Sequence, residues 1–221
     1  MVLSRTNAAR ARQAAAIAAG LAPALWAAYR YASGTVLIVD PVADLTTLSG
    51  LSAVAFLSAS LAVSPAVRFL GWRWAHSLRR TLGLIAFAYA VAHMLVFVAL
   101  DYGLDLRAIL SEGLLEKPFI LLGFAALLIL AALAATSTKA AMRRMGRRWT
   151  QLHRSVYAAA VLVAIHQSWA VKDPLAQVGE WAPWALVLGA LLVVRLPAVR
   201  ARLGRARRAA TVPRVQAPPA G

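Results

Sequence analysis

The chain contains no cysteine and very few acidic residues. Its 221 residues include 24 Lys and Arg but only 8 Asp and Glu, which gives a formal net charge of +16. The absence of cysteine excludes disulfides, thiolate-bound iron–sulfur clusters, zinc–thiolate sites and covalently attached c-type haem. Any redox chemistry must therefore use a histidine-ligated group, a flavin or a quinone.

Charged residues of both signs are scarce, whereas apolar residues are abundant. Hydrophobic residues make up 61% of the chain, charged residues make up 14%, and the mean hydropathy is +0.68. This composition is typical of a membrane protein and not of a soluble domain. We expect no nucleic-acid partner, because apolar stretches of membrane-spanning length separate the basic clusters.

Six apolar runs have the length of a membrane-spanning helix. They cover about residues 13–31, 47–66, 82–100, 118–137, 150–171 and 181–199. A hydrocarbon core of about 30 Å requires roughly 20 helical residues. Pro118 and Pro183 stand where the first turn of a helix tolerates proline. The sequence therefore predicts an all-α, polytopic membrane protein built as a six-transmembrane-helix bundle.

The charges separate into two sides if the chain crosses a membrane at each apolar run. One side receives 20 of the 24 cations, and the other side receives all 8 acidic residues. Because Lys and Arg are enriched in cytoplasmic loops, we expect both termini in the cytoplasm of a multi-pass membrane protein. Contact with anionic membrane lipid accounts for much of the positive charge. The predicted parts are a cytoplasmic amino-terminal segment (1–12), the transmembrane domain (13–199) and a basic, disordered cytoplasmic tail (200–221).

Three of the four histidines lie within the predicted spans, where ionisable residues mark candidate functional sites. His93 is eight residues before Asp101 in the third span, and His166 is seven residues before Asp173 in the fifth. A rise of 1.5 Å per residue places both roughly 10–12 Å inward from the outer boundary. Two neutral imidazoles facing each other at one depth can serve as the two axial ligands of a b-type haem. His93 and His166 are therefore the predicted iron ligands.

His153 stands apart from this pair. It precedes His166 by 13 residues, which places it roughly 20 Å nearer the cytoplasm and too far away to share that iron. The same spacing puts the two side chains about 140° apart around an ideal helix. Either they serve different neighbours or the helix is locally distorted. Arg79 occupies the position 14 residues before His93, where a histidine partner for a second, inner haem would be expected, and His76 is interpreted as an ordinary residue of a basic loop.

Five further residues could contact a cofactor. Three arginines near the inner face could pair with haem propionates or with a flavin phosphate, although membrane topology and lipid contact also explain them. Two tyrosines each lie four residues from a histidine on the same helical face, where they either contact the cofactor or pack against neighbours. These five residues are Arg79, Arg80, Arg154, Tyr89 and Tyr157. Trp149 is interpreted as part of an interfacial aromatic belt.

Three stretches of the chain resemble a known family. They are RRTLGLIAFAYAVAHMLVFVALD (79–101), EKPFILLGFAALLILAALAATST (116–138) and MGRRWTQLHRSVYAAAVLVAIHQSWAVKD (145–173). They resemble the MsrQ (YedZ) family of haem-binding membrane subunits, which is similar in turn to the ferric-reductase-like transmembrane domain of NADPH oxidases and ferric reductases. In the larger relatives, a pair of histidines on each of two helices holds two stacked haems. The resemblance assigns His93 and His166 to the outer haem and His153 to the inner one, with Arg79 in place of its partner.

The resemblance also implies an activity. It implies haem b with associated FMN, and electrons supplied by quinol or by a cytosolic flavin reductase. The acceptor it implies is MsrP, a periplasmic molybdopterin enzyme that reduces methionine sulfoxide in oxidised envelope proteins. The chain would then be an electron-transfer subunit and not itself the sulfoxide reductase. Two alternatives remain open: a quinol-oxidising or ferric-reducing cytochrome b, and a non-redox helical scaffold or transporter.

Overall fold

The chain folds into helices. A computed structural model describes residues 2–34, 39–114, 116–171, 177–199 and 201–202. Helices make up 89% of the structure, and these ranges contain no strand. The predicted all-α class is confirmed. Most of the predicted tail over residues 200–221 lies outside the described residues.

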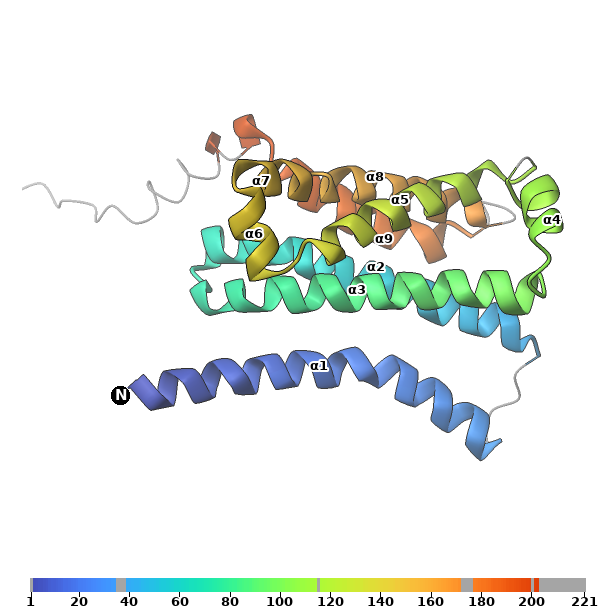
Figure 1. Ribbon diagram of the computed structural model, residues 1–221, viewed down its shortest axis with the longest axis horizontal. Helices are drawn as coiled ribbons and strands as arrows, with labels where there is room; N and C mark the ends of the chain where they lie inside the picture. The colour runs from blue at the N-terminus through green and yellow to red at the C-terminus, as the bar shows by residue number, and fades with distance from the viewer. Residues whose placement is uncertain (1, 35–38, 115, 172–176, 200, 203–221) are drawn as a thin grey trace, which may run out of the picture.

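Long helices run back and forth along one axis of the molecule (Figure 1). The first half comprises α1 (Val2–Ser33), α2 (Pro41–Pro65) with its π-helical extension η1 (Ala66–Leu70), the 3-10 turn η2 (Arg73–Ser77), α3 (Leu78–Val96) and its π-helical extension η3 (Phe97–Asp101). The second half comprises α4 (Leu106–Ala108), η4 (Ile109–Leu114), α5 (Pro118–Ala135), α6 (Lys139–Met145), α7 (Arg147–Arg154), α8 (Val156–Ala170) and α9 (Val178–Val193). The basic α6 and α7 lie at one end of the bundle, and α4 lies at the other (Figure 1).

Three helical stretches are long and apolar enough to cross a membrane. They are Pro41–Leu70, Arg73–Asp101 and Pro118–Ala135, and α9 is a shorter apolar helix. Large apolar side chains such as Leu186, which is 71% exposed, cover the outside of the bundle, where they would contact lipid. The chain is therefore a membrane protein. The count of six spans and the cytoplasmic placement of both termini remain predictions.

Local sequence signals set several helix starts. The Asp40 side chain accepts a hydrogen bond from the Ala43 N–H at 2.9 Å and caps α2. α5 begins at Pro118, as predicted. The prediction for Pro183 is wrong, because α9 begins earlier, at Val178, and Pro183 lies inside the helix. Inside the helix, Pro183 has no N–H to donate to the Gly179 carbonyl, so one helical hydrogen bond is missing. In the first turn of a helix no such bond would be lost.

The fifth apolar run is broken into two helices. α7 ends at Arg154 and α8 begins at Val156. Between them, the Ser155 hydroxyl donates a hydrogen bond to the Leu152 carbonyl at 2.6 Å. The run is therefore locally distorted, and the angle of an ideal helix does not relate His153 on α7 to His166 on α8.

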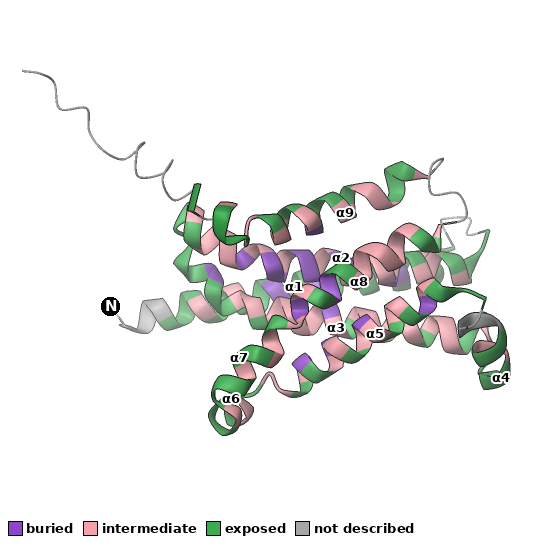
Figure 2. Ribbon diagram, turned by 90° about the horizontal axis from the view of Figure 1, so that it is seen from above, coloured by how far each residue is buried: buried purple, intermediate pink, exposed green. Residues whose placement is uncertain are grey.

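Buried side chains concentrate where α2, α3, α5, α8 and α9 meet (Figure 2). Leu61 of α2 and Leu188 of α9 are the largest fully buried side chains. Ala86 of α3 and Ala159 of α8 are both 0% exposed. Small residues at such positions let helix backbones approach closely, which is how membrane helices gain packing contacts.

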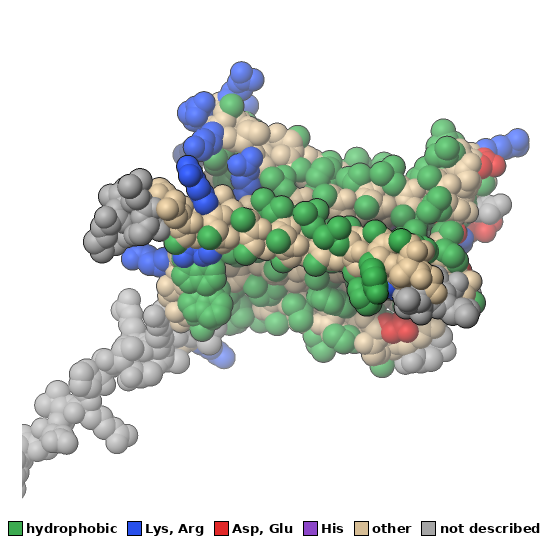
Figure 3. All heavy atoms as spheres, turned by 90° about the horizontal axis from the view of Figure 1, so that it is seen from below, with side chains coloured by type: hydrophobic (Ala, Val, Ile, Leu, Met, Phe, Trp, Pro, Cys, Tyr) green, Lys and Arg blue, Asp and Glu red, His purple; other side chains and the backbone are tan. Residues whose placement is uncertain are grey.

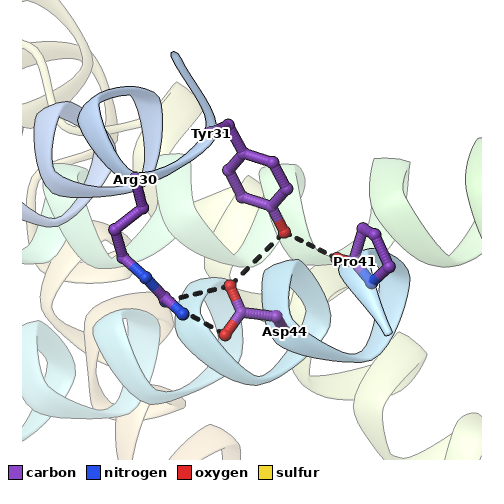
Figure 4. A network of polar contacts seen from close by, with 4 residues as sticks. All are labelled: Arg30, Tyr31, Pro41 and Asp44. Carbon is purple, nitrogen blue, oxygen red and sulfur yellow. Dashed lines mark hydrogen bonds and ion pairs between the residues drawn. The ribbon is translucent and has the colours of Figure 1, made fainter. Parts of the chain in front are cut away.

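α3 contacts α1 through the hydroxyl group of Tyr89, which is inserted between a backbone carbonyl and a backbone N–H of α1. The Tyr89 hydroxyl donates to the Gly20 carbonyl at 2.6 Å and accepts from the Ala24 N–H at 3.2 Å. Pro23 lies inside the same turn of α1, where the ladder is already weakened because proline has no N–H. At the carboxyl end of α1, Arg30 forms an ion pair with Asp44 at 3.1 Å, and the Tyr31 hydroxyl donates to the Pro41 carbonyl at 3.0 Å (Figure 4).

Candidate functional site

His93 and His166 lie next to each other in the bundle. His93 is on α3 and His166 is on α8, 73 residues apart in the sequence. Their ring centroids are 6.2 Å apart, and the ring planes are perpendicular, at 88°. The structure therefore brings together the two histidines that the depth estimate placed at one level.

Each of these imidazoles is held by a backbone carbonyl of a neighbouring helix. His93 Nδ1 is 3.0 Å from the Thr46 carbonyl of α2, and His166 Nδ1 is 2.7 Å from the Phe119 carbonyl of α5. Because a carbonyl only accepts, the partner assigns the proton to Nδ1 in both rings. The lone pair of each neutral ring is then on Nε2, which is the tautomer that ligates a metal through Nε2.

The two histidine sites have the same construction. In each, the carbonyl lies 47 residues before the histidine. A glycine follows that carbonyl by four residues, Gly50 in α2 and Gly123 in α5. A Cβ on Gly50 would lie 3.2 Å from the His93 ring, and one on Gly123 would lie 2.8 Å from the His166 ring. The helical pairs α2/α3 and α5/α8 thus present equivalent cradles for an imidazole.

This pair fits the two axial ligands of a haem iron. An imidazole centroid lies about 1.1 Å from Nε2 and a metal–nitrogen bond is about 2 Å, so two imidazoles on opposite sides of one ion have centroids about 6 Å apart. The described residues contain no group of three or more His, Cys, Asp or Glu that could hold a metal ion by protein ligands alone. Two histidines suffice for haem, because the porphyrin supplies the remaining four nitrogens.

A cavity of about 570 Å³ lies at the basic end of the bundle. One part of its wall is polar and contains five cationic or titratable side chains, together with Tyr157 and Trp149. The other part is apolar and comes from α2, α3 and α5. The volume is within the range of small-molecule and cofactor sites, about 300–1,000 Å³. The five cationic or titratable residues are His76, Arg79, Arg80, His153 and Arg154.

His153 has a different environment from the outer pair. Its Nε2 lies 3.2 Å from the Thr136 hydroxyl, which itself lies 2.7 Å from the Ala132 carbonyl. Since the single hydroxyl proton is donated to the carbonyl, the hydroxyl accepts from His153 Nε2–H. Trp149 stacks on the ring at a centroid distance of 3.9 Å and donates its indole N–H to the Thr136 carbonyl at 2.9 Å. Because Nε2 carries the proton in this arrangement, it has no lone pair to offer a metal, and ligation by His153 remains a prediction.

The remaining predicted residues divide between the cavity and the contact with α1. Arg79, Arg80, Arg154 and Tyr157 line the cavity. Tyr89 is directed to the backbone of α1, although it lies four residues from His93. The assignment of all these residues to a cofactor remains a prediction.

His76 and Trp149 are among the cavity-lining residues that sequence reasoning missed. His76 was interpreted as a loop residue, but it lines the cavity three residues before Arg79. Trp149 was interpreted as part of an interfacial belt, but it stacks on His153, four residues later on the same helix. The sequence did contain a signal for both residues, because His76 lies three residues before Arg79 and Trp149 lies four residues before His153. Residues at these spacings lie on one face of a helix.

The two ends of the bundle carry side chains of opposite charge. Lys and Arg side chains gather at the end that carries the cavity, whereas Asp and Glu side chains lie at the opposite end (Figure 3). The acidic end includes Asp101, eight residues beyond His93. The histidine pair is therefore on the side of the acidic end, and the cavity opens among cations.

The chain matches a known membrane family over residues 47–164, described as Ferric reductase like transmembrane component. The match covers more than half of the 221 residues. It includes His93 and His153, excludes α1, and ends just before His166. Such domains typically bind haem and are membrane electron-transfer components of the cytochrome type. The chain belongs to the family of ferric-reductase-like transmembrane components.

Proposed function

We propose that the protein is a b-type haem electron-transfer subunit of the bacterial inner membrane. It takes electrons at its basic, cytoplasmic end and passes them to the periplasmic molybdopterin enzyme MsrP for the repair of oxidised methionine. The observation that carries the haem assignment is the pair of equivalent imidazole cradles that hold His93 and His166 at a centroid distance of 6.2 Å.

His93 and His166 would hold the haem, which supplies a one-electron ferric/ferrous couple when bound. The carbonyls of Thr46 and Phe119 fix the tautomer and the orientation of the two rings. With both His93 and His166 as ligands, the iron would have no free coordination position for oxygen or substrate. The residues therefore support outer-sphere electron transfer and not catalysis at the metal.

The basic cavity is the proposed side of electron input. Arg79, Arg80 and Arg154 line it and provide guanidinium groups for a propionate or a flavin phosphate. His153 and the stacked Trp149 form part of the same wall. Quinol or a cytosolic flavin reductase is the proposed donor, and FMN is the proposed additional cofactor, on the basis of the resemblance to MsrQ.

The proposed acceptor also rests on that resemblance, chiefly on residues 145–173. A specific rival is a ferric-reducing cytochrome b, which the description of the matching family favours. The protein, reduced anaerobically, is mixed with MsrP and methionine sulfoxide, or with a ferric chelate. Reoxidation by the first mixture and not by the chelate supports the proposal. Reoxidation by the chelate alone would establish the rival.

A variant of His153 tests whether electron entry at the basic cavity is separate from the haem held by His93 and His166. His153→Ala is expected to slow reduction by the quinol or flavin donor at least about tenfold, while the spectrum of the haem between His93 and His166 is unchanged. Gln151→Ala, two residues away on exposed α7 surface, is the matched control. Loss of all haem in His153→Ala would contradict the separation of the two levels.

A further inference from the structure

A second cavity, of about 270 Å³, lies between the end of α2 and the end of α9. Arg68 and Phe69 of η1 line one side, Arg195 lines the other, and Tyr157 of α8 forms part of the wall. The volume equals that of about nine water molecules at roughly 30 Å³ each, which is enough for a phosphate with a small polar substituent. The proposed electron transfer does not use this cavity.

Arg195 is positioned by three helices. Its guanidinium group donates through Nη1 to the Leu191 carbonyl of α9 and through Nη2 to the Leu61 carbonyl of α2. Its Cζ atom lies 5.4 Å from the ring centroid of Tyr157 on α8. The orientation of this cation is therefore set by the packing of α2, α8 and α9.

None of these three partners carries a negative charge. Two are carbonyl dipoles and one is an aromatic ring, so none of them neutralises the half-buried guanidinium. The acidic side chains of the described residues lie at the opposite end of the bundle (Figure 3). Partly buried cations are costly without a counter-ion, and guanidinium groups bind phosphate in a bidentate manner. Arg68 places a second guanidinium group on the same cavity wall.

Apart from Ser64 and Tyr157, the rest of the wall is apolar. Pro65, Phe69 and Val194 line the cavity beside the two arginines. They belong to the ends of helices whose outer surfaces carry exposed large apolar residues, including Leu70 and Val193. A free phosphate ion gains nothing from such a wall, whereas the glycerol and first acyl carbons of a phospholipid bury against it.

We propose that this cavity binds the phosphate of an anionic phospholipid at the basic end of the bundle. Basic pockets between membrane helices on the cytoplasmic side have the chemistry for such headgroups. The bound lipid contacts η1 and α9 together and neutralises the Arg195 guanidinium. The site is separate from the histidine pair and does not depend on the proposed redox function.

Native mass spectrometry of the full-length holoprotein tests the proposal. Delipidated protein in a non-ionic detergent is titrated with phosphatidylglycerol or with phosphatidylcholine of the same acyl chains. Wild-type protein is expected to retain phosphatidylglycerol at about tenfold lower lipid concentration, a difference of about 1.4 kcal/mol. Arg195→Gln and Arg68→Gln are each expected to abolish this preference. Arg202→Gln, an exposed cation of the same basic end, is the matched control and keeps it.

Three outcomes would overturn the proposal. The first is equal retention of both lipids by the wild type, and the second is an unchanged preference in the arginine variants. The third is complete displacement of the lipid by millimolar inorganic phosphate, which would make this a free-phosphate site. Thermal unfolding is measured for each variant, and if Arg195→Gln does not fold, Arg68→Gln decides the question.

Discussion

Glycine at positions 50 and 123 determines how closely each imidazole approaches the neighbouring helix. The His166 ring lies so near α5 that a Cβ at Gly123 would be 2.8 Å from its Cε1 and Nδ1 atoms. The contact is less severe at Gly50, where the corresponding distance to the His93 ring is 3.2 Å. These glycines let each ring reach the carbonyl that fixes its tautomer.

Gly123→Ala is therefore expected to displace the His166 ring and to weaken haem binding. Overpacking of this kind costs about 1–3 kcal/mol, and about 1.4 kcal/mol is tenfold in affinity. Haem affinity is measured by titration of the apoprotein. Gly189→Ala in α9 is the control, because no atom lies within 4 Å of its added Cβ. Equal haem affinity in both variants would show that haem binding does not require the close approach of the His166 ring to Gly123.

The perpendicular planes of the two imidazole rings predict the type of electron paramagnetic resonance signal that a bound ferric haem should give. Two imidazole ligands held at an interplanar angle of 88° would leave the dπ orbitals of a bound haem iron nearly degenerate. The ferric protein should then give the strongly anisotropic low-spin electron paramagnetic resonance signal of perpendicular ligand planes. A rhombic signal typical of parallel planes would mean that the rings rotate when haem is bound.

At the scale of helices, α1 is an addition to the matched domain, which begins at residue 47. The Tyr89 hydroxyl connects α1 to α3 at Gly20, beside Pro23. The sequence placed Tyr89 on the face of His93, but it could not indicate that a hydroxyl group would enter the ladder of another helix.

Tyr89→Phe removes this link and leaves the ring in place. A lost hydrogen bond costs about 0.5–1.5 kcal/mol, which lowers the melting temperature by about 2–4 °C per kcal/mol in a chain of this size. The haem spectrum and the reduction potential should not change. Phe56→Leu, which removes the aromatic ring stacked on Tyr89 at 5.8 Å, keeps the hydroxyl and serves as the comparison. A shifted potential in Tyr89→Phe would place this tyrosine at the cofactor.

Helix positions followed from apolar runs better than helix interruptions did. The run over 118–137 corresponds closely to α5 (Pro118–Ala135). The run over 150–171 gave no sign of the break at Ser155, since the serine hydroxyl bonds locally and no proline or glycine marks the position. α1 begins at Val2 and not at residue 13, because polar residues near the amino terminus extend the helix without adding apolar length.

At the scale of the whole molecule, the charge separation predicts the orientation in the membrane. Lys and Arg gather at one end, and Asp and Glu lie at the other (Figure 3). The cavity lies at the basic end, and the histidine pair lies towards the acidic end. The pairing of His93 and His166 could be anticipated from depth alone, since both precede an outer acidic residue by a similar number of residues. The cavity could not, because it depends on η2, α3 and α7 meeting in three dimensions.

Reporter insertions test this orientation. Green fluorescent protein fused after Gly221 should fluoresce, because the predicted carboxyl terminus is cytoplasmic. Alkaline phosphatase inserted after Gly103, in the turn beyond η3, should be active because that turn is predicted to be periplasmic. A non-fluorescent fusion at the carboxyl terminus, together with an inactive phosphatase after Gly103, would reverse the assignment.

The absorption spectrum of the purified protein before and after dithionite tests whether His93 and His166 hold a haem between them. Wild-type protein should show a Soret band that shifts on reduction, and His93→Ala and His166→Ala should each lose the haem held between them. His76→Ala, a histidine of the basic end, should keep that haem. An unchanged dithionite-sensitive spectrum in both His93→Ala and His166→Ala would show that these two histidines do not hold the haem.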